Sequence, residues 1–111
     1  MTVSKLEEMS DRIELAHQRV QKDFQDINPV VGLSRKMRDI GYDVDVIMID
    51  CHSTKRRIIL LLHDDSPNTV RYQFAFLDKD PGDQYEDISH QELSEQMLYD
   101  WMVSYFSKTN L

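Results

Sequence analysis

The apolar residues at the start of the chain repeat with the spacing of an amphipathic α-helix. Between residues 4 and 27, apolar side chains recur every three or four positions: Leu6, Met9, Ile13, Ala16, Val20, Phe24 and Ile27. Ser4 is a suitable N-cap, because acidic residues follow it in the first turn, where the helix dipole favours them. Pro29 should end the helix, since proline disfavours the α conformation in the residue before it. The pattern therefore predicts a long helix over residues 4–27.

A shorter second helix is predicted over residues 30–40, and three β-strands follow it. The candidate helix places apolar side chains on one side and basic side chains on the other, and Gly41 is a suitable C-terminal stop. The strands are expected at residues 42–51, 56–64 and 69–77, which are rich in Val, Ile, Tyr and Phe. Polar connections of hairpin length separate them, so consecutive strands should pair as an antiparallel meander.

A final helix is predicted from Ser89 to about residue 107. Ser89 and Glu92 have the spacing of a capping box, and the positions that follow carry many large apolar and aromatic side chains. Together these elements predict a single α+β domain over residues 1–111, in the order α-α-β-β-β-α. Its centre is a three-stranded antiparallel β-meander, against which a long N-terminal helix, a short second helix and a C-terminal helix pack.

The two faces of this sheet follow from the strand register, because successive side chains of a strand point to opposite faces. We expect Cys51 to pair near Arg56 and Asp64 to pair near Thr69. This register gives one face the character of a core: Val44, Val46, Met48, Ile59, Leu61, Val70, Tyr72, Phe74 and Phe76. The opposite face then carries a contiguous apolar patch: Ile47, Ile49, Ile58, Leu60 and Leu62.

Soluble monomers rarely leave an apolar patch of this kind bare, so something should cover it. The candidates are the long first helix, with the last helix on the other face, and the same patch of a second subunit related by a two-fold axis. We expect a homodimer. A strict monomer across micromolar concentrations would instead assign the patch to the first helix.

The charge of the chain is concentrated in one segment. The chain has 111 residues, 41% of them apolar and 30% charged, and its net charge is −7. Residues 78–100 hold eight acidic residues and one lysine, so this segment accounts for the whole net charge. Such a surface favours cationic partners and disfavours nucleic acid, and the alternative, which is the more common case, is a solvated surface that keeps the protein soluble. The residues expected to contact a basic partner protein are Asp78, Asp80, Asp83, Glu86 and Asp87.

His63, Asp64 and Asp65 form the most enzyme-like string in the sequence. A histidine beside carboxylates can bind a metal ion or act as an acid-base pair. Adjacent side chains on a strand point to opposite faces, however, so His63 and Asp64 could share an ion only across a bend. The chain has neither a glycine-rich phosphate loop nor a Cys/His set with zinc spacing. We therefore predict no catalytic residue, no cofactor and no metal ion, and these three residues are the candidates if a metal does bind.

The location expected from the sequence is the cytoplasm. Cys51 is the single cysteine, so no internal disulfide can form, whereas small secreted domains usually carry several. Residues 1–10 lack the pattern of an export signal. The longest apolar run, residues 58–62, is far shorter than the roughly 20 residues that cross a bilayer.

These features favour a small, acidic, cytoplasmic protein that acts through protein-protein interaction, as an adaptor, chaperone or regulator. We expect it to be homodimeric and non-catalytic, on the basis of its acidic segment and of analogy at the level of the fold. Two alternatives stay open. One is an acidic inhibitor that imitates nucleic acid in the basic groove of another protein, and the other is a metal-dependent enzyme centred on His63, Asp64 and Asp65.

Overall fold

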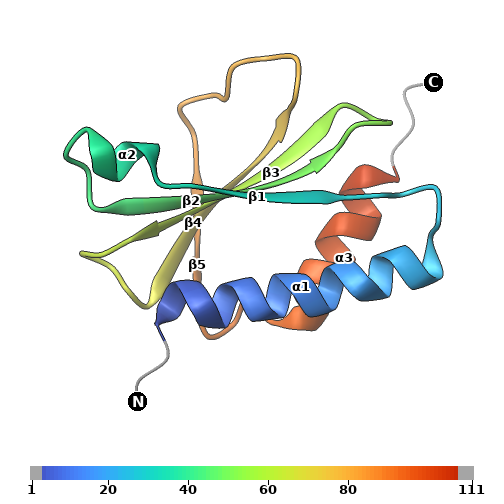
Figure 1. Ribbon diagram of the computed structural model, residues 1–111, viewed down its shortest axis with the longest axis horizontal. Helices are drawn as coiled ribbons and strands as arrows, with labels where there is room; N and C mark the ends of the chain where they lie inside the picture. Colours follow the sequence, from blue (N-terminus) through green and yellow to red (C-terminus); the bar gives the residue numbers. More distant parts are fainter. Residues whose placement is uncertain (1–3, 108–111) are drawn as a thin grey trace.

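The protein has one antiparallel β-sheet with two long helices on the same face, as the computed structural model in Figure 1 shows. The structure describes residues 4–107. The elements follow in the order α1 (Lys5–Asp23), β1 (Val30–Ser34), α2 (Lys36–Asp39), β2 (Val44–Cys51), β3 (Arg56–His63), β4 (Thr69–Phe76), β5 (Glu86–Ser89) and α3 (Glu95–Phe106). The predicted α+β class and antiparallel sheet are confirmed, but the sheet has five strands, in the order β1-β2-β3-β4-β5, and not three.

The first additional strand replaces most of the predicted second helix. Residues 30–34 form β1, which pairs antiparallel with β2, so that Val31 lies opposite Ile49 and Leu33 lies opposite Ile47. Only the single turn of α2 remains helical. The helical prediction was wrong because β-branched valines and a glycine lower helix propensity, and pairing with an apolar neighbouring strand decided the outcome.

The second additional strand occupies the predicted start of the last helix. Residues 86–89 form β5, which pairs with β4, with Ile88 opposite Val70. The capping box expected at Ser89 is not used. Instead the hydroxyl of Ser94 accepts a hydrogen bond of 3.2 Å from the backbone N–H of Met97, and α3 begins at the next residue. A serine five residues further along the chain supplies the cap, so the predicted helix began too early.

The N-terminal helix begins as predicted and ends earlier than predicted. Ser4 caps it by accepting from the backbone N–H of Glu7, at 3.1 Å. Phe24 is already the C-cap, where its backbone N–H donates to the carbonyl of Val20. Ile27, which the periodicity placed on the helix, is buried in the connection to β1.

The register between β3 and β4 differs by one residue from the predicted one. Arg56 pairs with Phe76 and Leu61 with Arg71, whereas the pairing of β2 with β3 places Cys51 opposite Arg56, as predicted. A shift of one residue turns every side chain of a strand to the other face. The structure therefore places Val70, Tyr72 and Phe74 on the face of Ile58 and Leu60, and not with Ile59 and Leu61.

This common face is the core of the protein, because α1 and α3 cover it. The five residues predicted as a dimer patch lie beneath the helices, and none is more than 7% exposed: Ile47, Ile49, Ile58, Leu60 and Leu62. They are not available to a second subunit, so the prediction of that patch as a dimer surface was wrong. The first helix covers it, together with Leu98, Met102 and Phe106 of α3. Trp101 of α3 completes the cover and lies 4.6 Å from Tyr72 between ring centroids.

Candidate functional site

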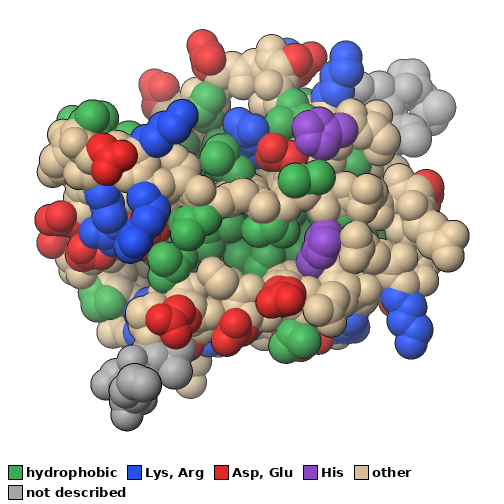
Figure 2. Space-filling model, in the orientation of Figure 1, with side chains coloured by type: hydrophobic (Ala, Val, Ile, Leu, Met, Phe, Trp, Pro, Cys, Tyr) green, Lys and Arg blue, Asp and Glu red, His purple; other side chains and the backbone are tan. Residues whose placement is uncertain are grey.

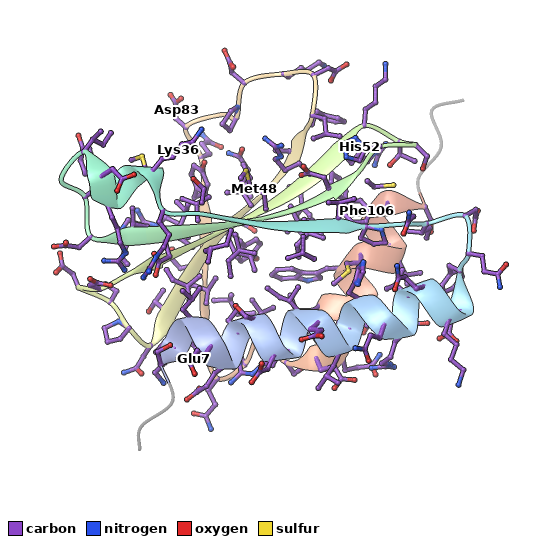
Figure 3. All side chains as sticks on the ribbon, viewed as in Figure 1. Glu7, Lys36, Met48, His52, Asp83 and Phe106 are labelled. Atoms are coloured by element: carbon purple, nitrogen blue, oxygen red, sulfur yellow. The ribbon has the colours of Figure 1, made fainter. Side chains whose placement is uncertain are left out.

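The face of the sheet opposite α1 and α3 carries a groove, and we call this face the open face. Val46, Met48, Ile59 and Leu61, which the sequence assigned to the core, form its floor. Figure 3 shows Met48 pointing away from the two helices. The groove has a volume of about 600 Å³. Because two neighbouring strands are apolar on both faces, the protein has an apolar core beneath the helices and a second apolar surface at the groove.

One wall of the groove is formed by α2 and the turn that follows it. Met37 and Tyr42 line this wall, and the backbone N–H of Tyr42 donates to the carbonyl of Met37 at 2.9 Å. Gly41 lies between them with φ of +100°, a conformation that residues with a Cβ rarely adopt. The glycine thus lets the chain turn from α2 into β2 and brings Tyr42 to the rim.

An ion cluster on the helix side of the sheet holds α2 in place. Arg38 donates to both oxygens of Asp45, at 2.7 and 3.0 Å, and to both oxygens of Asp64, at 2.9 and 2.8 Å. Arg35 also donates to Asp45, at 3.1 Å. Asp45 is 4% exposed, and the hydrogen bonds from Arg38 and then Arg35 hold its pKa below the ordinary value, against the opposing effect of burial. Hydrogen bonding from Arg38 likewise lowers the pKa of Asp64.

The other wall is the connection between β4 and β5, residues 77–85, which arches over the open face (Figure 1). Pro81 and Tyr85 line the groove from this side. Gln73 of β4 fixes the connection, because its side-chain amide donates to the carbonyls of Gly82, at 3.0 Å, and Gln84, at 2.8 Å. A side chain on the sheet therefore sets the position of this wall.

A pair of opposite charges lies at one end of the groove. Arg57 of β3 donates to both oxygens of Asp50 on β2, at 2.7 and 3.0 Å. The hydrogen bonds to Asp50 raise the pKa of Arg57 above its ordinary value. Since each of the two residues neutralises the other, this end of the groove carries no net charge from them.

The five predicted partner-binding carboxylates divide into two groups. Asp78, Asp80 and Asp83 lie on the 77–85 wall, are exposed, and form no ion pair within residues 4–107. Figure 2 shows acidic side chains above the sheet in this region. By contrast, Glu86 accepts a hydrogen bond from Tyr72, and Asp87 pairs with Arg71 at 3.0 Å. The first group is therefore the part of the predicted surface that is free for a partner.

The remaining acidic residues of the 78–100 segment lie elsewhere. The segment passes around the edge of the sheet into α3, on the helix side. There Glu95 pairs with Arg19 of α1, at 3.1 Å. The acidic segment that is continuous in the sequence is thus separated by the fold into a groove wall and a part of the helix pair.

The string of His63, Asp64 and Asp65 does not converge. His63 and Asp65 line the groove, whereas Asp64 turns to Arg38 on the other side. Nε2 of His63 is buried and has no hydrogen-bond partner among the described residues. Within residues 4–107, no three His, Cys, Asp or Glu side chains are grouped so that they could hold a metal ion.

Sequence reasoning missed the residues that form the walls. The sequence predicted a helix over residues 30–40 with its apolar side, which includes Met37, turned toward the core, and it predicted no binding role for Tyr42, Pro81 or Tyr85. One signal was present in the sequence: β3 is apolar on both faces, which requires cover on both, while the helices suffice for one. Comparisons of the chain with protein-family models, curated proteins and solved structures give no match.

Proposed function

We propose that this protein is a non-catalytic interaction module, acting as an adaptor, chaperone or regulator, that binds an amphipathic basic segment of another protein in the open-face groove. One observation carries the proposal. An apolar floor that no helix of the described residues covers lies beside a wall that holds three exposed carboxylates: Asp78, Asp80 and Asp83.

The floor supplies the apolar half of this recognition. Val46, Met48 and Leu61 are partly exposed and adjoin one another across β2 and β3. Fully burying an apolar side chain of this size contributes about 2 kcal/mol. Because about 1.4 kcal/mol corresponds to a tenfold change in affinity, each apolar anchor on the partner raises the affinity by more than tenfold, and charged contacts must add to the anchors to offset the cost of association. An amphipathic helix that lays its apolar side into a groove is a common form of such recognition.

The 77–85 wall supplies the charged half. Its three aspartates carry no compensating ion pair within residues 4–107, and the chain as a whole has a net charge of −7. A field of this sign accelerates association with cationic segments and weakens as salt is added. The preferred partner therefore presents Lys or Arg beside its apolar anchors.

The affinity of two synthetic peptides tests this proposal. One peptide has leucines at helical spacing with lysines on its polar side, and the other replaces the lysines by glutamates. We expect the lysine peptide to bind, with an affinity that falls as salt rises, and the glutamate peptide to bind at least roughly tenfold more weakly. Fluorescence anisotropy of labelled peptides measures both affinities.

Two variants separate the apolar and charged contributions. Leu61→Ser removes an anchor of the floor, and the double variant Asp80→Asn with Asp83→Asn removes charge from the wall. The matched control is Glu7→Gln with Asp11→Asn, which removes the same charge from exposed positions on α1, on the far side of the sheet (Figure 3). We expect each groove variant to weaken the lysine peptide by about tenfold and the control to leave it within twofold.

The outcomes distinguish the proposal from its alternative. Equal binding of both peptides, or no effect of Leu61→Ser, overturns binding in the groove. If the aspartate variant alone abolishes binding, the acidic surface acts without the groove, as the imitation of nucleic acid would require.

The cytoplasm is the location we propose, because the single cysteine, Cys51, is a buried free thiol that suits a reducing compartment. In the part of the chain that the structure describes, no helix is both long enough and apolar enough to cross a membrane. Fractionation of the native cell tests this location, which recovery of the protein outside the cytoplasmic fraction would contradict.

A further inference from the structure

The two edges of the sheet differ in how they are protected. Strand β5, at one edge, is short and carries Glu86 and Asp87, which discourage pairing with another strand. Strand β1, at the other edge, pairs with β2 alone within residues 4–107, and it contains neither a charged residue nor a proline. Val30, Val31 and Leu33 of β1 are between 42% and 51% exposed, although they are apolar. An uncharged apolar edge strand of this kind is a template for a further strand.

A hollow beside β1 extends the apolar surface of this edge. It lies between α1 and β1, has a volume of about 440 Å³, and exposes apolar side chains where Figure 2 looks onto the edge. The buried residues Ile13 and Ile47 form its floor, and Val31 and Leu33 lie at its rim. The helix layer therefore stops short of the edge strand, and the partner of this edge must cover apolar side chains as well as pair with the backbone.

We propose that a second copy of this chain pairs its own β1 antiparallel with β1, so that two sheets join into one across a two-fold axis. The strand has five residues with Gly32 at its centre. A two-fold axis at Gly32 places Val31 opposite the partner's Leu33 and Val30 opposite the partner's Ser34. Apolar side chains then meet apolar side chains on the hollow side, and no like charges meet within the strand pair.

The charges that flank β1 are complementary in this arrangement. The connection that precedes the strand carries one charged residue, Asp26, which is exposed. The residues that follow the strand include Arg35 and Lys36, both also exposed. Antiparallel pairing brings the start of one strand to the end of the other, so Asp26 of each copy lies at the same end of the strand pair as the partner's Arg35 and Lys36, twice by symmetry. A parallel pair would instead bring the two basic ends together.

The oligomeric state in solution tests this proposal. Val31→Lys places a charge on the edge, as natural edge strands do, at a position that is exposed enough to accept lysine. Ile40→Lys is the matched control, because Ile40 is 69% exposed and lies after α2, outside β1. Sedimentation equilibrium from micromolar to millimolar concentration should show a dimer for the wild type and for Ile40→Lys. The dissociation constant of Val31→Lys should be at least roughly tenfold higher.

Thermal unfolding of both variants tests whether they remain folded. A wild type that stays monomeric over the whole concentration range overturns the proposal and leaves the edge for a strand of another protein. Dimerisation of Val31→Lys with the wild-type constant overturns it as well, since the dimer would then use another surface.

Cysteine cross-linking tests the register. A Cβ at Gly32 would meet no atom within 4 Å, so Gly32→Cys is tolerated, and the two-fold axis brings its thiol beside that of the partner. Val30→Cys is the control, because the same residue of the partner lies further along the partner's strand and not opposite position 30. Under mild oxidation Gly32→Cys should form a covalent dimer much faster than Val30→Cys. Equal rates, or the reverse order, contradict pairing centred on Gly32.

Discussion

The guanidinium of Arg38 binds the carboxylate of Asp45 through two hydrogen bonds, from Nε to Oδ1 at 2.7 Å and from Nη2 to Oδ2 at 3.0 Å. This pair joins α2 to β2, and α2 is a single turn that would have little stability alone. Since Met37 of that turn lines the groove, the ion pair on the helix side positions a wall on the open face. We therefore expect a variant that breaks the Arg38–Asp45 pair to weaken binding in the groove as well.

Replacement of Asp45 by asparagine should reduce stability and flatten its dependence on acid. The pKa of Asp45 is lowered in the folded protein, so its contribution is present above the ordinary carboxyl range near pH ~4 and is lost as the pH falls below it. We expect Asp45→Asn to lower the free energy of unfolding at neutral pH by about 2 kcal/mol. Urea unfolding, repeated at intervals of about one pH unit from about pH 2 to about pH 7, measures how the free energy of unfolding depends on pH.

Asp64→Asn, at a far more exposed carboxylate, is the control and should have a smaller effect on the free energy of unfolding. An unchanged profile for Asp45→Asn would contradict the role of the pair.

Two neighbouring leucines on β3 distinguish the core from the groove. Leu60 is fully buried beneath the helices, and Leu61 is partly exposed on the open face. Leu60→Ala should lower the free energy of unfolding by about 3 kcal/mol, because truncation of a buried leucine leaves a cavity. Leu61→Ala should lower it by less than about 1.5 kcal/mol and should weaken the lysine peptide instead. Equal losses of stability would mean that both faces are covered in the same way.

Two serines test where α3 begins. Ser94→Ala removes the hydroxyl that accepts from the backbone N–H of Met97 and should lower the free energy of unfolding by about 1 kcal/mol. Ser89→Ala, at the capping box that the sequence suggested, should change it by less than about 0.5 kcal/mol. Chemical denaturation of the two variants gives both values. A larger loss for Ser89→Ala than for Ser94→Ala would mean that the helix begins near Ser89.

Removal of the Gln73 amide should loosen the acidic wall of the groove. Gln73→Ala loses the hydrogen bonds to the carbonyls of Gly82 and Gln84. Each such bond contributes about 1 kcal/mol, so the loss of both should make opening of residues 77–85 roughly thirtyfold more frequent. Limited digestion with trypsin should show this as faster cleavage after Lys79, which is exposed in that wall, and leave cleavage after Lys22 of α1 as it was. Unchanged cleavage after Lys79 would contradict the role of Gln73.

The elements that the sequence predicted well are those whose signals are local. The repeat of α1 and its Ser4 cap, the β2–β3 hairpin and its register each depend on residues close in the chain. The two missed strands, β1 and β5, are short, and each forms because an existing strand offers it a backbone to pair with. Intrinsic helix and strand propensities differ by only a few tenths of a kcal/mol per residue, so pairing with a neighbouring strand outweighs them.

The candidate site was predicted less well than the fold, and the cause is the register of one strand. The β3–β4 turn determines the register of the two strands, and the register determines whether Val70 lies on the same face as Leu60 or as Leu61. Either register leaves apolar residues on each face of β3. The sequence showed that a second apolar surface exists. It did not show that the surface with Ile47 and Ile58 is beneath the helices and that the one with Met48 is open.

The methyl signals of the methionines test binding in the groove most directly. Met37 and Met48 line the groove, whereas Met9 and Met102 are buried in the core on the other side of the sheet. On titration of the isotope-labelled protein with the lysine peptide, binding in the groove predicts that the Met37 and Met48 signals shift and that those of Met9 and Met102 stay in place. A peptide that binds while Met37 and Met48 remain unchanged, or that does not bind at all, would contradict the proposed function.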